Sequence, residues 1–230
     1  MTTETKAQWV KIIKKLPSLF LGCFLFATGT VATLYGGLGM SPWGVFHMGI
    51  ANHTPFTLGQ VTQLLGLIIL LIGYKMGRIP GLGTICNMIF VGGFMDLIEK
   101  LGVLRVPETL VGKFTMLAFG ILISGWGSYF YLRVQLGAGP RDGLMEGLVK
   151  KLKKPVWLIR GTMETTVLIL GYFLGGPVGI GTVITALTLG FSVQFAFRLG
   201  GYSPKKARHI NFLEMFKLLS GKDLCKETSY

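Results

Sequence analysis

The amino-acid sequence predicts an all-α integral membrane protein whose six transmembrane helices form two inverted three-helix repeats. Three observations predict this class. Half of the 230 residues are hydrophobic and only 14% are charged, apolar stretches long enough to cross a membrane recur along the chain, and the second half repeats the first. The mean hydropathy of +0.58 is also typical of membrane proteins.

The internal repeat has a constant offset of 98 residues. Pro80-Gly-Leu-Gly-Thr84 returns as Val178-Gly-Ile-Gly-Thr182, and most of the chain follows the same register without a gap. Other pairs at this offset are Gly22 with Gly120, Gly39 with Gly137, Pro42 with Pro140, and Gly49 with Gly147. A unit of this length is too long for a solenoid and indicates a duplicated helix bundle. Chance similarity between glycine-rich apolar sequences does not explain an ordered, gapless series.

Six apolar stretches approach the ~20 helical residues needed to cross the hydrocarbon layer. They cover residues 17–35, 58–74, 81–98, 114–132, 156–174 and 179–197. The predicted organisation is a basic cytoplasmic leader (1–16), a first repeat (17–102), an extracytoplasmic linker (103–113), a second repeat (114–200) and a basic amphipathic cytoplasmic tail (201–230).

Lysine and arginine lie mostly on one side of the predicted spans. Of the 23 Lys and Arg residues, all but Lys100, Arg105 and Lys113 fall on the side of the leader. This positive-inside pattern places both termini in the cytoplasm. The net charge of +13 then reflects topology and attraction to anionic lipid headgroups, so no nucleic-acid partner is required. Because each half has three spans, the second half must insert upside down, as in many secondary transporters.

Two short segments, 39–49 and 137–147, follow the first and fourth spans. Pro42 and Pro140 each suit a first helical turn. We expect the first segment to be an interfacial helix anchored by Trp43 or a re-entrant segment facing a cavity. Its His47 is either a proton carrier or an interfacial histidine bonded to backbone or water. The second segment, with Asp142, is expected to lie as an amphipathic helix on the headgroups.

Several motifs resemble a known family. They are Gly-Met-Ser-Pro-Trp-Gly-Val-Phe-His (39–47), Thr-Leu-Gly-Gln (57–60), Pro-Gly-Leu-Gly-Thr (80–84) and Asn-Met-x-Phe-x-Gly-Gly-Phe-x-Asp (87–96). Together they resemble the YczE/YyaS/YitT group of bacterial integral membrane proteins, the YczE type most closely, over about residues 18–200. An acidic residue usually follows Pro-Trp in that family; Gly44 stands there, while Asp142 keeps it in the second copy. The resemblance implies a bacterial plasma-membrane protein but no reaction or substrate.

Polar residues within predicted spans form the candidate binding set. Such residues are costly in lipid and usually face a bundle interior or a cavity. Arg160 and Glu164 are one helical turn apart and could form a structural pair, or the glutamate could bind a cation or a proton. The amides and hydroxyls could bind solute or only join helices by hydrogen bonds. The full candidate set for substrate or ion is Glu164, Arg160, Asn87, Gln63, Gln60, Thr84, Thr182, Thr185 and His47.

Glycine motifs at 81–84 and 179–182 begin predicted helices, where free amides could bind an anion. Close helix packing is the simpler explanation for them. The cysteines lack metal-ligand spacing, and Cys23 and Cys86 are expected to be small packing residues.

No catalytic constellation is visible, so neither an enzyme nor a cofactor is expected. Two functions stay open. One is a small transporter with a midplane site for a solute or ion. The other is a non-transporting membrane subunit or scaffold, and assembly as a homodimer or with a partner membrane protein is also open.

Overall fold

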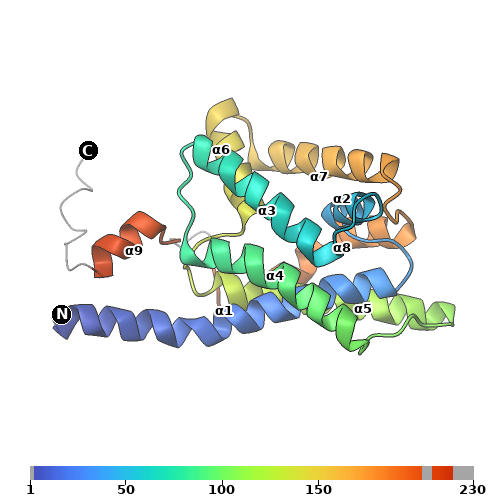
Figure 1. Ribbon diagram of the computed structural model, residues 1–230, viewed down its shortest axis with the longest axis horizontal. Helices are drawn as coiled ribbons and strands as arrows, with labels where there is room; N and C mark the ends of the chain where they lie inside the picture. The colour runs from blue at the N-terminus through green and yellow to red at the C-terminus, as the bar shows by residue number, and fades with distance from the viewer. Residues whose placement is uncertain (1–2, 204–208, 220–230) are drawn as a thin grey trace.

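The computed structural model describes residues 3–203 and 209–219, and within these ranges all regular secondary structure is α-helical (Figure 1). The helices are α1 (Thr3–Tyr35), α2 (Pro42–Ala51), α3 (Leu58–Lys75), α4 (Leu82–Leu101), α5 (Leu110–Leu132), α6 (Pro140–Leu152), α7 (Val156–Phe173), α8 (Ile180–Leu199) and α9 (Phe212–Leu219). Five of them, α1 from Trp9 onward, α3, α4, α5 and α8, are long and apolar enough to cross a membrane. The predicted all-helical membrane character is confirmed.

Helix α7 is the expected fifth span. It has 18 residues, but its first half carries Arg160 and Glu164, and it is not among the five apolar helices. Its crossing of the membrane therefore stays a prediction. Helices α2 and α6 stand where short helices were expected, and at 10 and 13 residues both are too short to cross the hydrocarbon layer.

Helices α1 and α5 form the central pair of the bundle and run along the lower edge of Figure 1. Glycines let their backbones approach closely. A Cβ atom added to Gly127 would lie 2.5 Å from the backbone nitrogen of Phe26, and one added to Gly120 would lie 2.7 Å from the carbonyl oxygen of Gly29. Small residues commonly line helix interfaces in membranes, where close packing replaces the hydrophobic effect. Helix α4 packs against α1, and α8 packs against α5.

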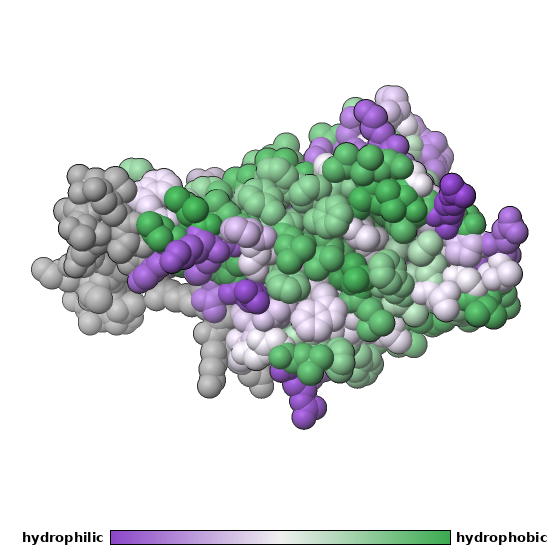
Figure 2. All heavy atoms as spheres, turned by 90° about the horizontal axis from the view of Figure 1, so that it is seen from below, coloured by the Kyte–Doolittle hydropathy of each residue, from purple (hydrophilic) through white to green (hydrophobic). Residues whose placement is uncertain are grey.

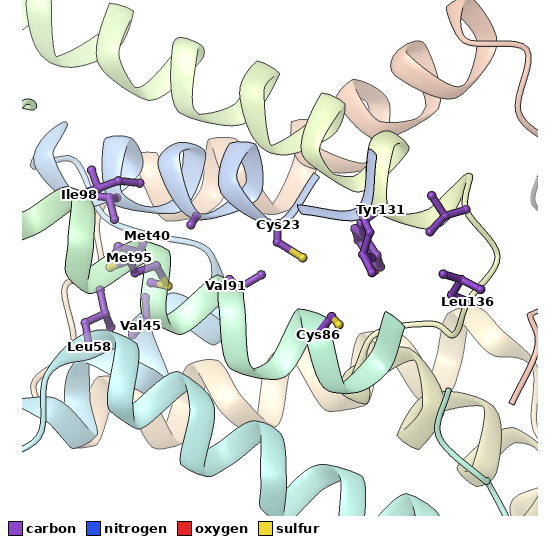
Figure 3. Close-up of a cluster of buried hydrophobic side chains, with 14 residues drawn as sticks. Cys23, Met40, Val45, Leu58, Cys86, Val91, Met95, Ile98, Tyr131 and Leu136 are labelled. Carbon is purple, nitrogen blue, oxygen red and sulfur yellow. The ribbon is translucent and has the colours of Figure 1, made fainter. Parts of the chain in front are cut away.

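The largest buried cluster lies beside this pair and joins α1 to α4 and to the end of α5 (Figure 3). Leu19, Cys23 and other residues of one α1 face are fully buried in it. Cys86 of α4 and Tyr131 of α5 belong to the same cluster. Both cysteines are free and buried, which confirms that they are packing residues.

The 98-residue offset reappears in the helix boundaries and in the contacts between the halves. Helices α4 and α8 begin and end at equivalent positions, and α2 and α6 begin at equivalent prolines. The amide of Gly83 donates to the carbonyl of Leu136, and the amide of Gly181 donates to the carbonyl of Leu38, both at 2.7 Å. Leu38 and Leu136 are equivalent in the repeat, and so are Gly83 and Gly181. Each half therefore donates the same backbone hydrogen bond to the other half.

The halves also differ. Helix α3 packs against α4, whereas α7 makes at most marginal contact with its counterpart neighbour α8 and packs against α2 instead. Large apolar side chains such as Phe173 and Phe191 are strongly exposed there. Another face, seen in Figure 2, is also dominated by hydrophobic residues, with hydrophilic groups mostly toward its margins. Lipid tails would cover such surfaces.

The basic leader predicted for residues 1–16 continues from residue 3 into α1 without a break, with Pro17 inside the helix. In the predicted tail, α9 places Phe212 and Phe216 beside Lys217 on a short helix. Residues 1–2, 204–208 and 220–230 of these two predicted segments lie outside the described ranges.

Replacing Gly127 with alanine should destabilise the protein, because the added methyl group meets backbone atoms of α1 that cannot move independently. We expect a loss of about 1–3 kcal/mol, typical of overpacking. Gly190→Ala is the matched control, since nothing lies within 4 Å of a Cβ at that exposed position of α8; it should be neutral or slightly stabilising. Thermal unfolding in detergent measures both, and equal melting temperatures for the two variants would contradict close α1–α5 packing.

Candidate functional site

Trp43 of α2 and Arg141 of α6 meet between the two halves. The guanidinium carbon of Arg141 lies 4.5 Å from the centroid of the Trp43 ring, in a cation–π contact. The two residues are equivalent in the repeat, since each follows the proline that opens its helix. Residues at equivalent positions touch only where the two halves meet, so this contact marks their junction.

Arg141 is surrounded by acidic groups but bonded to none of them. Glu164 and Asp142 are the carboxylates whose charge acts on it most. Among the described residues, no carboxylate oxygen lies within 4.0 Å of its guanidinium nitrogens, and the ion pairs present join other residues: Arg78 with Glu146 and Arg160 with Glu164. The N–H donors of Arg141 are therefore open to a ligand.

Asp142 neighbours Arg141 on α6 and accepts a hydrogen bond from the hydroxyl of Tyr131 at 3.3 Å. Burial raises the pKa of Asp142, while the charges of Arg160 and Arg141 oppose that rise. Asn87 belongs to the same group. A Cβ placed on Gly139 would lie 3.4 Å from the Tyr131 hydroxyl, 3.5 Å from Asn87 Oδ1 and 3.7 Å from an Asp142 carboxylate oxygen. A polar cluster therefore surrounds the start of α6.

His47 lies one turn after Trp43 on α2 and is buried, with 4% of its surface exposed. Its Nδ1 lies 2.9 Å from the hydroxyl oxygen of Thr62. The single proton of that hydroxyl is donated to the carbonyl of Leu58 at 2.8 Å, so Nδ1 of His47 must be the donor to Thr62. Nε2 is buried and has no hydrogen-bond partner among the described residues.

The electrostatics keep His47 neutral. Burial lowers its pKa well below the usual value, and the positive charge of Arg141 lowers it further. A neutral imidazole with its proton on Nδ1 presents a lone pair at Nε2. The buried Nε2 is therefore an acceptor.

A small cavity of about 30 Å³ is lined by both Arg141 and His47. Its polar lining comes from Thr30, Ser41, His47, Thr62 and Arg141. A second, larger cavity of about 210 Å³ lies between the end of α3, the start of α4 and α6. Pro140, next to Arg141, lines this larger cavity together with Thr84 and the Arg78–Glu146 ion pair, whose N···O distance is 2.6 Å.

The predicted site residues separate into two groups. Glu164, Arg160, Asn87 and His47 lie at or near the junction of the halves. Arg160 Nε and Glu164 Oε1 are 4.0 Å apart, which makes a long ion pair between residues one turn apart on α7. Trp43 and Asp142 were expected at the membrane interface. In the structure, Trp43 packs against Ile69 and Val167, and Asp142 lies beside Tyr131, because α2 and α6 pack between longer helices. Their depth in the membrane stays a prediction.

The remaining predicted residues support the fold. Gln60 accepts from the Thr57 amide in a capping box, and Gln63 donates to the carbonyl of Ile89. Thr84 and Thr182 accept from the amides of Gly81 and Gly179 at the starts of α4 and α8. Thr185 is buried, and its hydroxyl has no partner in the described chain. Helices α4 and α8 make at most marginal contact, so these threonines and Asn87 do not form one patch.

Sequence reasoning missed Arg141, Tyr131 and Thr62. Arg141 was detectable in principle, because it is the repeat equivalent of Trp43, and equivalent residues can meet on a two-fold axis. Tyr131 and Thr62 carry no comparable signal. Within the described ranges, no group of three or more His, Cys, Asp or Glu side chains could hold a metal ion.

Comparisons with known proteins agree with the membrane character. Residues 13–198 match the model of a family of unknown function, DUF6198. An uncharacterised protein of Haemophilus influenzae is 35% identical over 81% of this chain and 85% of its own. The uncharacterised membrane protein YczE of Bacillus subtilis is 34% identical over 77% and 82% of the two chains, and YyaS of the same organism is 25% identical over 72% and 83%. No solved structure matches.

Thr84→Val should destabilise the fold, because its hydroxyl also donates to the carbonyl of Ala138 at 2.6 Å. Loss of this buried bond and of the cap on Gly81 should cost about 1–3 kcal/mol. Thr188→Val is the matched control, since that exposed hydroxyl bonds only within its own helix. The melting temperatures of the two variants are compared by thermal unfolding in detergent. Equal melting temperatures would show that the hydrogen bond from Thr84 to Ala138 does not stabilise the fold.

Proposed function

The chain belongs to the DUF6198 family of unknown function, and we propose that it is a small secondary transporter that moves a small solute or ion through a site between its two halves. The observation that carries this proposal is the group of charged side chains at the junction: Arg141, Asp142 and Glu164 gather where Trp43 and Arg141 meet. Charged groups inside a membrane protein are expensive and usually mark the path of a substrate or ion.

The proposed architecture has six spans, with α7 as the fifth crossing. Three crossings in each half would leave the halves in opposite orientations, and sites of inverted-repeat transporters lie at the repeat interface. The exchanged hydrogen bonds of Leu38 with Gly181 and of Leu136 with Gly83 support a two-fold relation between the halves. Both termini would lie in the cytoplasm of a bacterial plasma membrane, with basic segments against anionic headgroups.

The two cavities support a path that reaches this site. The larger one lies beside the end of α3 and the first two turns of α6, on the proposed cytoplasmic side, and Pro140 is part of its wall. The smaller one is lined by Arg141, the residue after Pro140 on α6, and by His47. Alternating access would require the Arg78–Glu146 ion pair, which bridges α6 and the segment after α3, to break and reform.

Cysteine labelling tests the sixth crossing. In a chain whose native cysteines are replaced, Lys151→Cys and Val178→Cys would flank α7 at exposed positions. Because α7 is proposed to cross, a membrane-impermeant maleimide should label the cysteine at 178 in intact cells and the cysteine at 151 only after permeabilisation. Labelling of both positions from the same side would rule out a crossing by α7.

A transport assay tests the function. A broad solute screen by thermal stabilisation of the purified protein selects ligands, since a ligand that binds the folded state raises the melting temperature. Uptake of the selected solutes into proteoliposomes should exceed that of empty liposomes. Glu164→Gln should reduce uptake more than about tenfold, the effect of losing roughly 1.4 kcal/mol, while the exposed control Arg198→Gln should retain it.

Absence of uptake by the unaltered protein throughout that screen would contradict the proposal. A stoichiometric partner that co-purifies with a non-transporting protein would instead favour a subunit or scaffold role.

A further inference from the structure

We infer that Arg141 and His47 form a proton-linked binding site for a small monovalent anion, of the kind presented by a carboxylate group, in which the anion binds Arg141 and a proton from solution joins Nε2 of His47. The inference deepens the proposed function and rests on it, because it names the substrate class of the same site. Three observations lead to it, one for each group and one for the space between them.

Arg141 carries a positive charge that no ion pair within the described residues neutralises. It is held over the Trp43 ring, and no carboxylate of the described chain lies within 4.0 Å of its guanidinium nitrogens. A guanidinium presents paired N–H groups whose spacing matches the two oxygens of a carboxylate. The contact with the Trp43 ring is not a hydrogen bond, so it does not satisfy the guanidinium N–H donors.

His47 supplies the second unsatisfied group. Its Nδ1–H is committed to Thr62, because the proton of Thr62 is committed to Leu58. Nε2 is buried without a partner in the described chain, so a donor group of a ligand, or a proton shared with a ligand, would satisfy it. A lone pair cannot bind an anion, whereas a protonated Nε2–H can donate to one.

The cavity limits what fits between them. Its volume of about 30 Å³ is two to three times the ~10–15 Å³ that a cavity needs to hold one water molecule. Ser41, Thr30 and Thr62 add hydroxyl groups to its wall. A single carboxylate group, as in formate or at the end of a larger acid, or an inorganic anion of similar size, suits this space. A sugar or a nucleotide does not.

Charge couples the two binding events. Within the described residues, Arg141 is the charged group that acts on His47, and it disfavours protonation of the empty site. Glu164 and Asp142 act on Arg141, and Arg160 acts on both carboxylates. Lys75 is the last residue of α3, and His53 follows the end of α2, where its Nδ1 lies 3.0 Å from the carbonyl oxygen of Gly49. An anion on Arg141 offsets the positive charge and accepts a hydrogen bond from Nε2–H, which raises the pKa of His47.

The sign of the pH dependence follows from this linkage. Anion binding raises the pKa of His47, so the anion binds more tightly when the pH falls. Affinity should rise by up to about tenfold per pH unit between the pKa of the occupied site and the lower pKa of the empty site. One anion and one proton enter together, which leaves the net charge of the protein unchanged and would make transport electroneutral.

Histidine NMR tests the inference with formate as the probe. The chain has three histidines, so ¹⁵N-histidine spectra of the full protein in nanodiscs are assignable with His53→Asn and His209→Asn. Without formate, we expect His47 to be neutral with its proton on Nδ1 between about pH 7.5 and 5.5, near the ordinary range of histidine. Sodium formate should convert it to the doubly protonated form, whereas sodium sulfate at equal ionic strength should not.

Variants assign the effect to Arg141. Arg141→Leu should abolish the formate response, Arg141→Lys should weaken it while keeping the charge and the fold, and Arg198→Leu should leave it intact. In His47→Gln, thermal stabilisation by formate should lose its pH dependence. A His47 resonance in the unaltered protein that formate never shifts, or a response that persists in Arg141→Leu, overturns the inference.

The assay measures binding and not transport, so it separates the two proposals. A formate response without any uptake contradicts the transport function and leaves the anion site standing. Uptake of a solute that is insensitive to Arg141→Leu contradicts the anion site and leaves the transport function standing.

Discussion

The close contact between α1 and α5 is the constraint on which the rest of the structure depends. Glycines at equivalent places on the two helices let the backbones meet, and each helix carries one half of the bundle with it: α4 on α1 and α8 on α5. With this pair in place, the short helix of each half reaches the other half. Helix α2 packs against α7, and α6 packs against α3. Because each short helix packs against the other half, Trp43 of α2 and Arg141 of α6 come into contact.

This arrangement places an arginine where its charge is difficult to stabilise. Burial of an unpaired ion costs several kcal/mol, whereas a cation–π contact contributes about 0.5–2 kcal/mol. Glu164 and Asp142 lower the cost through longer-range attraction without closing an ion pair. In the proposed anion site, a ligand that brings negative charge to Arg141 would lower this cost. The neutral His47 beside it adds a group whose lowered pKa would rise when an anion binds nearby. The charge balance of the junction therefore depends on what occupies the cavity.

Much of the fold was predictable from the sequence, and the chemistry of the junction was not. Local apolar runs and prolines predict helices directly, and the 98-residue offset predicts equivalent boundaries such as those of α4 and α8. Lys150 and Lys151 lie in the last turn of α6, whereas Arg141 and Asp142 lie in its first turn, in contact with Trp43 and Tyr131 respectively. The sequence suggested that Gln60 and Thr84 bind a ligand within the membrane, but in the structure both cap the start of a helix. This role depends on the exact residue at which the helix begins, which the sequence does not predict to within one residue.

The central claim is that two equivalent halves meet at Trp43 and Arg141 and enclose a charged site within the membrane. An electron cryomicroscopy structure in lipid nanodiscs measures this most directly, because it shows the bilayer together with the side chains. The account predicts that the halves enter the bilayer in opposite orientations, with α7 crossing it and Arg141 stacked on Trp43 between them. Halves in the same orientation, or an Arg141 side chain that faces bulk water, would contradict it.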